Sequence, residues 1–198
     1  MKVDGRVERG EQTRRQILRR AVDIASVEGL EGLSIGRLAT ELHVSKSGVF
    51  AHFGSKEELQ LKTVSAAAAI FSDLVVTPAL ALPDGGPRLT ALMEGWLAYS
   101  EGRTFPGGCF FSTVQAEFDA REGRVRDLIA DYDRRWTSLV SATAARIPGL
   151  TEDPDQLAFE LVAYLELANV RSVLHADPAA YTRARAAVAS RLALAVSA

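Results

Sequence analysis

Apolar residues recur at helical spacing in the N-terminal third of the chain, and serine or threonine residues stand where helices would begin. In the first such segment one face carries Ile17, Ala21, Ile24 and Ala25. Thr13 and Gln16 have the spacing of a capping box, and Gly29 suits a left-handed helix end. The pattern therefore predicts a helix that begins at Thr13 and ends at Gly29.

Two shorter helices follow within a few residues of each other. Ser34 can cap a helix over residues 35–42, and Ser45 can cap another over residues 46–52. Because so short a connection prevents the two helices from lying antiparallel, they must cross sharply. That arrangement is a helix-turn-helix, in which the second helix reads DNA. We call residues 34–53 the reading head.

A further capping box, Ser55 with Glu58, begins a fourth helix. The run TRRQILRRAVDIASVEGLEGLSIGRLATELHVSKSGVFAHFGSKEEL resembles the N-terminal domain of the TetR family of bacterial transcriptional regulators. The most specific positions are Ala21, Gly29, the Leu38-Ala39 pair, Val44-Ser45 and the string from His52 to Leu59. The resemblance implies a DNA-binding domain over residues 10–58 and a helical effector-binding and dimerisation domain over residues 59–198.

Two residues depart from the family pattern. His43 stands where the turn usually has glycine, and histidine is among the residues that tolerate a positive φ. Phe50 stands where tyrosine is more usual, so the ring is kept but the hydroxyl that could touch a phosphate is lost. We therefore expect the turn to survive and one backbone contact to be missing.

Lys46 and Ser47 lie in the first turn of the reader helix, the part that enters the major groove of double-stranded operator DNA. Other expected DNA contacts are Arg14, Ser34, Arg37, Ser45, Phe50, His52 and Lys56. The net charge of −2 is low for a DNA-binding protein, but residues 1–20 hold seven Lys and Arg against three Asp and Glu. The positive charge is thus concentrated where phosphates are expected.

Composition narrows the class of protein. The chain has 198 residues, of which 47% are apolar, so it can bury a proper core. It shows neither a signal-peptide pattern nor an uninterrupted apolar span of membrane length, and its single cysteine cannot form an internal disulfide. We expect a cytoplasmic protein that does not bind a membrane. No metal-ligand spacing, phosphate loop or nucleophile motif points to a metal, a cofactor or an enzyme.

The rest of the chain reads as further helices, without strand-like alternation. Pro78, Pro83 and the cluster at residues 84–87 predict a break after the fourth helix. Proline and glycine positions then delimit helices over about 87–101, 109–119, 122–146, 154–175 and 178–196. The fold class is therefore all-α, with about nine helices.

Aromatic residues gather between positions 96 and 136, and apolar walls with a few polar groups are typical of ligand cavities. The resemblance implies an effector cavity among the fifth to eighth helices, for an unidentified small apolar or amphipathic molecule. The candidate ligand-binding residues are Trp96, Tyr99, Phe105, Cys109, Phe110, Gln115, Trp136 and Asn169. A helix N-terminus can lower a thiol pKa, so Cys109 is either a thiol sensor or a small buried residue.

The segment at residues 154–175 is apolar on two sides. One stripe contains Leu161, Tyr164, Leu165 and Ala168, and a second contains Phe159, Val162, Val170 and Val173. The resemblance implies a homodimer that packs its last two helices as a four-helix bundle, and we assign the first stripe, with Ala187 and Arg191, to that interface. The alternative is a buried central helix in a monomer.

These observations predict a homodimeric transcriptional regulator that binds a pseudo-palindromic operator. The resemblance implies a repressor relieved by its effector. The alternative function is a helical small-molecule-binding or thiol redox-sensing protein that uses Cys109 and has a vestigial DNA-binding head.

Overall fold

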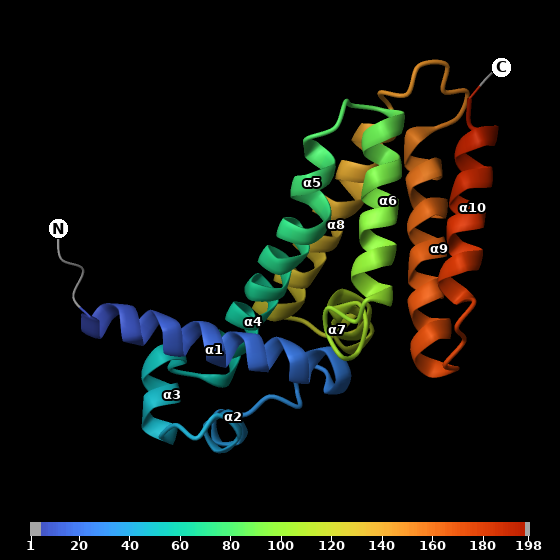
Figure 1. Cartoon of the computed structure of the whole chain (residues 1–198). Coiled ribbons are helices and arrows are strands. Elements are labelled where there is room, and N and C mark those ends of the chain that lie inside the picture. Colours follow the sequence, from blue (N-terminus) through green and yellow to red (C-terminus); the bar gives the residue numbers. More distant parts are fainter. Residues whose placement is uncertain (1–4, 197–198) are drawn as a thin grey trace.

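A computed structural model describes residues 5–196, apart from the side chains of residues 5–7 and 9. Across this range the chain forms nine helical rods and no strand, which confirms the all-α prediction (Figure 1). Eight of the rods are α1 (Gly5–Glu28), α2 (Ile35–Glu41), α3 (Lys46–Phe53), α6 (Gly86–Glu101), α7 (Phe110–Phe118), α8 (Arg124–Ala144), α9 (Pro154–Leu174) and α10 (Ala180–Leu194).

The remaining rod is continuous where a break was predicted. It runs through α4 (Lys56–Phe71), a π-helical turn η1 (Ser72–Val76) and α5 (Thr77–Leu80). Pro78 therefore does not end the helix, and that prediction is wrong. The wide turn of η1 already changes the pattern of carbonyl acceptors just before Pro78, so the missing proline N–H is accommodated there. The break comes at the end of α5 instead.

Helices α2, α3 and α4 begin where the serine caps predicted. The hydroxyls of Ser34, Ser45 and Ser55 each accept a hydrogen bond from the backbone N–H three residues later, at 3.0–3.1 Å. His43 has a φ of 55°, so histidine does adopt the left-handed conformation in the turn. Thr13, in contrast, lies inside α1 and is not its cap, because α1 already includes Gly5.

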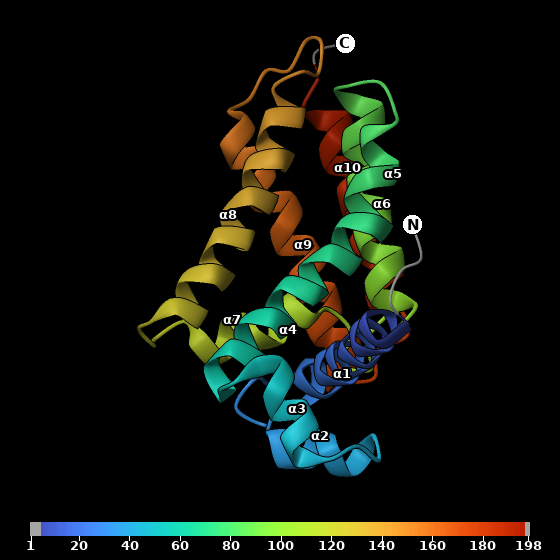
Figure 2. The same cartoon turned by 90° about the vertical axis from the view of Figure 1, so that its left-hand side faces the viewer.

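Figure 1 shows α2 end-on and α3 in profile, so the two helices cross sharply as expected. They lie beneath α1, and the apolar side chains between the three helices form one continuous core with the body. In the body, α9 packs against α6, α8 and α10. Helix α7 lies at the base of the body against α1, as Figures 1 and 2 show from two sides. The reading head therefore contacts α1 and α4, and α1 in turn packs against α7.

By length and composition alone, one helix in the described part of the chain, the rod Lys56–Leu80, is long and apolar enough to cross a membrane, with a mean hydropathy of 1.6. This helix is not an uninterrupted apolar span, because Asp73 lies within it, and the run of alanines in α4 raises its mean hydropathy. The rod packs against α1, α6 and α8 within this fold, and its buried side includes Leu59, Val64 and Ala67. We interpret it as a core helix.

Candidate functional site

The exposed face of α3 carries the residues that were predicted to read DNA. Lys46 and Ser47 are exposed, and Phe50 keeps 55% of its surface accessible. Val49 and Phe53 point the other way and are buried. Residues 47 and 50 share one face of the helix and residues 49 and 53 another, as helical periodicity requires, and Lys46 is exposed at the first position of the helix. The structure brings these side chains to one surface, and their contact with DNA stays a prediction.

Arg37 has carboxylate partners within the protein. Its Nε donates to Glu41 at 2.8 Å, and its terminal nitrogens donate to Glu28 at 2.5 and 2.7 Å. Arg20 donates to the same Glu41 at 2.5 Å. Hydrogen bonds from Arg37 hold the pKa of both carboxyl groups below their usual range. Arg37 therefore fastens α2 to α1, and contact with a base would require these ion pairs to open.

Lys56 also has hydrogen-bond partners within the protein. Its ammonium group donates to the Glu31 carbonyl at 3.0 Å and to the Glu31 carboxylate at 2.8 Å. Arg121 lies 3.3 Å from the same carboxylate. These contacts tie the turn between α1 and α2 to the start of α4 and to the end of α7. Lys56 thus has a structural role that the sequence did not suggest, and its phosphate contact stays a prediction.

The other predicted DNA contacts surround the reader helix. Ser45 is exposed and caps α3, and Ser34 is exposed and caps α2. Arg14 and His52 are half-exposed, and the Arg14 guanidinium lies 3.9 Å from the Glu11 carboxylate. All four remain accessible from the surface of the head.

An aromatic cavity of about 290 Å³ lies in the body, between the α4 rod and α8. Four of the predicted ligand residues line it, namely Trp96, Cys109, Gln115 and Trp136. The sequence reasoning missed the rest of the wall, which consists of Ala68, Phe71, Ser72, Val76, Phe111, Tyr132, Asp133, Arg135 and Leu139. These residues have the helical spacing of ordinary core positions. The sequence pattern alone therefore does not distinguish cavity-lining residues from residues of the packed core.

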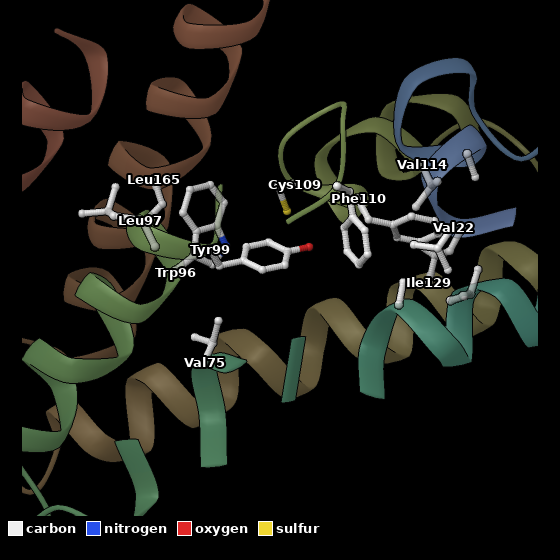
Figure 3. Close-up of a cluster of buried hydrophobic side chains, with 14 of the residues drawn as sticks. Val22, Val75, Trp96, Leu97, Tyr99, Cys109, Phe110, Val114, Ile129 and Leu165 are labelled. Carbon is white, nitrogen blue, oxygen red and sulfur yellow. The ribbon is translucent and has the colours of Figure 1, made fainter. Parts of the chain in front are cut away.

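The other four predicted ligand residues lie outside the cavity wall. Phe105 and Phe110 are fully buried, and Phe105 packs beneath the Arg19 guanidinium, 5.1 Å from its ring centre. Tyr99 is 4% exposed, and Figure 3 shows its hydroxyl pointing toward Cys109 and Phe110. These rings pack in the core around the loop before α7, and their contact with a ligand stays a prediction.

Asn169 also has a structural role, because it accepts hydrogen bonds within the core. Its Oδ1 accepts from the Ser100 hydroxyl at 2.9 Å and from the Cys109 backbone N–H at 3.0 Å. The Ser100 hydroxyl lies 2.8 Å from the Tyr181 hydroxyl. Since a buried amide requires such partners, this network accounts for Asn169 without a ligand. It fixes the backbone at the start of α7.

Burial raises the pKa of the Cys109 thiol to about 12, and the nearby negative charge of Glu166 adds to the effect. The expectation that a helix N-terminus would lower this pKa is therefore wrong, because the desolvation of a side chain that is 1% exposed outweighs the helix dipole. Cys109 is a small buried wall residue. Among the described residues, no cluster of three or more His, Cys, Asp or Glu side chains could hold a metal ion.

Helix α7 joins the cavity to the head. Phe111 and Gln115 on one face line the cavity. On another face, the Glu117 carboxylate accepts hydrogen bonds from the backbone N–H groups that follow α1, at 2.6 and 2.8 Å. The Thr113 hydroxyl donates to the Ser26 carbonyl at 2.9 Å. A displacement of α7 would therefore break or shift its hydrogen bonds to the end of α1. These contacts join residues more than 80 positions apart, so the sequence gave no sign of them.

The protomer buries part of the predicted dimer stripe of α9. Leu161 and Leu165 are fully buried within the protomer, and the Arg191 side chain is paired with Glu152 and Glu160. The other stripe is the exposed one, because α9 already packs on α6, α8 and α10 with its first side. Tyr164, Ala168 and Ala187 border a surface groove between α9 and α10. The outward apolar residues of α9 are Phe159, Leu167, Val170, Val173 and Leu174.

Solved structures that resemble this fold include transcriptional regulators. A TetR transcriptional regulator from Chloroflexus aurantiacus is 21% identical, with a TM-score of 0.85 over 96% of this chain and 98% of that chain. A transcriptional regulator from Saccharomonospora viridis in complex with choline is 22% identical, with a TM-score of 0.78 over 94% and 98%. AibR, in complex with isovaleryl coenzyme A and operator DNA, is 20% identical, with a TM-score of 0.65 over 78% and 84%. These likenesses show the fold.

Family models match both parts of the chain. Residues 17–62 match the model of bacterial regulatory proteins of the tetR family, and residues 85–188 match the tetracyclin repressor-like C-terminal domain. No curated protein matches the chain by sequence. The C-terminal match alone spans more than half of the chain, and the N-terminal match includes the whole reading head. The chain therefore belongs to the TetR family of transcriptional regulators.

Proposed function

We propose that this protein is a homodimeric repressor that binds double-stranded operator DNA and releases it when a small molecule enters the aromatic cavity. The observation that carries this proposal is the double role of α7. One of its faces supplies Phe111 and Gln115 to the cavity, and another holds the end of α1 through Thr113 and Glu117. A ligand that displaces the cavity face must move the contact with the head.

A row of exposed apolar residues along α9 supports the homodimer. Phe159, Ala163, Leu167, Val170 and Leu174 follow one another at intervals of three or four residues, the spacing of a helix–helix seam. A contiguous exposed apolar patch of this kind promotes aggregation unless another surface covers it. A second copy would bring an identical stripe by two-fold symmetry and so cover both.

Such a dimer presents two reading heads related by the same axis. The operator should then be a pseudo-palindrome whose half-sites lie roughly 34–36 Å apart, or a multiple of that. An effector would favour a separation of the heads that no longer fits this spacing. It can shift the balance only by its difference in affinity for the two states.

The similar structures support a ligand-controlled DNA binder, since one holds choline and another holds isovaleryl coenzyme A together with operator DNA. They differ in the ligand, so the effector of this chain must be inferred from its own cavity. We propose that the protein acts without catalysis and in the cytoplasm, where its operator would be. Thiol sensing is not proposed, because Cys109 is buried and its thiol pKa is raised.

The test measures binding of the protein to the intergenic DNA upstream of its own gene. The DNA is a labelled duplex, and its fluorescence anisotropy reports binding. Lys46→Ala should weaken binding about tenfold or more, with the loss concentrated at one base position if Lys46 reads a base. Arg134→Ala, which removes an exposed cation of α8, is the matched control and should bind normally. Failure of the wild type to prefer any upstream segment over random DNA would contradict the proposal.

A further inference from the structure

We propose that the aromatic cavity selects a small organic cation with a quaternary ammonium group. This inference rests on the proposed function, because it names the chemical class of the effector. Three features of the cavity carry it: the aromatic walls, the carboxylates near it without cationic partners, and its size.

Five aromatic rings enclose the cavity, and they come from four different helical segments. The Phe71 ring meets the Trp136 ring edge to face, with 5.2 Å between their centres, and the Phe111 ring at 6.4 Å. The Tyr132 ring lies 5.9 Å from that of Phe111. The remaining ring is that of Trp96. Aromatic faces attract cations through their quadrupole, and quaternary ammonium groups are the cations that such cages bind well.

Two carboxyl groups lie near this cavity: Asp133 at its exposed rim, and Glu166, which is negative above its raised pKa. Asp133 lines it, and its Oδ1 accepts a hydrogen bond from Gln115 at 2.8 Å. Glu166 lies behind the wall, where it accepts from the Ser112 hydroxyl. Its charge acts on the Cys109 thiol, which is part of the wall. In the described part of the chain no Lys, Arg or His comes within ion-pair distance of either carboxylate.

The one cationic residue of the wall has an acidic partner at the surface. The Arg135 guanidinium pairs with Asp131 at 2.8 Å, and its side chain is 71% exposed. It also lies over the Tyr132 ring, 5.7 Å from the ring centre. Its charge is therefore compensated at the surface by Asp131. An anionic ligand would meet Asp133 and Glu166 without a free cation to bind it.

The cavity volume of about 290 Å³ limits the ligand further. It stands at the lower end of the range for small-molecule sites, so a compact molecule fits and a nucleotide-bearing conjugate does not. The walls are mostly apolar, which suits the methyl groups around a quaternary nitrogen. A compact, permanently charged cation satisfies the size, the apolar wall and the carboxylates together.

Three ligands of similar shape but different charge separate the effect of charge on binding from the effect of shape. Choline is the cation, 3,3-dimethylbutan-1-ol replaces its nitrogen with carbon, and 3,3-dimethylbutanoate is the anion. The chain has two tryptophans, Trp96 and Trp136, and both line the cavity, so intrinsic fluorescence reports its occupancy. We expect choline to bind about tenfold more tightly than the alcohol, and the alcohol more tightly than the carboxylate. Equal binding of choline and the alcohol, tighter binding of the carboxylate, or no fluorescence change with any probe up to about 10 mM would overturn the inference.

Asp133→Asn tests the charge without changing the shape of the wall. It should reduce the preference for choline over the alcohol severalfold and leave binding of the alcohol unchanged. Asp127→Asn, at an exposed position of the same helix, is the control and should keep the wild-type preference. An unchanged preference in Asp133→Asn would contradict the assigned role of the carboxylate.

The two proposals fail in different ways. If wild-type protein binds its operator but shows no preference for choline, the ligand class is wrong and the regulator stands. If choline is preferred but no upstream DNA is bound, the cavity chemistry stands and the proposed function is wrong.

Discussion

The carboxylate of Glu117 accepts a hydrogen bond of 2.6 Å from the backbone N–H of Leu30, just beyond the end of α1. Its other oxygen accepts from the next N–H, that of Glu31, at 2.8 Å. The side chain is 15% exposed, so water competes weakly for these donors. One residue of α7 thereby caps the turn that leads into the reading head, and this links the cavity helix to the DNA-binding domain.

Glu117→Gln should loosen that link. The amide keeps one acceptor but turns an NH₂ group toward the second backbone donor, so we expect a loss of about 1–3 kcal/mol in the free energy of unfolding. Hydrogen exchange at the amides of Leu30 and Glu31 should become faster. Glu122→Gln, at an exposed carboxylate nearby, is the control. Unchanged exchange in Glu117→Gln would mean that the cap is not maintained in solution.

Gly107→Ala should push the loop before α7 away from α1 and so destabilise the protein. A Cβ at position 107 would lie 1.8 Å from the Ser26 carbonyl oxygen, and the Gly107 N–H donates to the Ser26 hydroxyl at 3.1 Å. The backbone must shift to relieve this overlap, at a cost of about 1–3 kcal/mol, measured by thermal or urea unfolding. Gly10→Ala meets no atom within 4 Å and should not destabilise the protein. Equal stability of both variants would contradict the close packing at Gly107.

Native Cys109 should react slowly with a thiol reagent. Burial raises its pKa to about 12, so almost no thiolate is present at pH 8. Ellman's reagent should react at least about a hundredfold faster with the protein unfolded in urea than with the native protein. Because the chain has one cysteine, Cys109→Ala supplies the zero-signal control. Fast stoichiometric reaction of native protein, with loss of operator binding, would favour the thiol sensor instead.

Glu166 should make stability depend on pH. Burial raises the pKa of its carboxyl group above the unfolded value. Between those two pKa values the native state binds the proton more tightly than the unfolded state, so the free energy of unfolding falls as pH rises through this window. Glu166→Gln stays neutral, so its stability relative to wild type should increase with pH from about 4 to 8, measured by urea unfolding. A constant difference over that range would contradict the raised pKa.

The elements of the head could be predicted because their signals are local. Each cap formed by Ser34, Ser45 and Ser55 is a hydrogen bond to a backbone N–H three residues away, and the positive φ of His43 follows from the turn itself. Such contacts are encoded within a few residues, so the sequence determines them before any tertiary packing forms.

The site could be predicted only in part because its geometry is long-range. Phe71 and Tyr132 occupy positions that suit any core, and only the packing of α4 against α8 turns them toward a cavity. The two apolar stripes of α9 were identified, but their sides were exchanged, since periodicity does not say which stripe the protomer covers. Leu165 of the first stripe is buried, whereas Val170 of the second keeps 44% of its surface accessible.

The proposed dimer is tested most directly by sedimentation velocity of Leu167→Asp at micromolar concentration, with and without operator DNA. We predict that wild type is a dimer, that Leu167→Asp is a folded monomer because an unpaired charge is placed in the interface, and that it loses operator binding. Leu82→Asp, at an exposed leucine away from α9 and α10, should remain a dimer that binds. A dimeric Leu167→Asp, or a monomeric wild type that still binds a single half-site, would contradict the account.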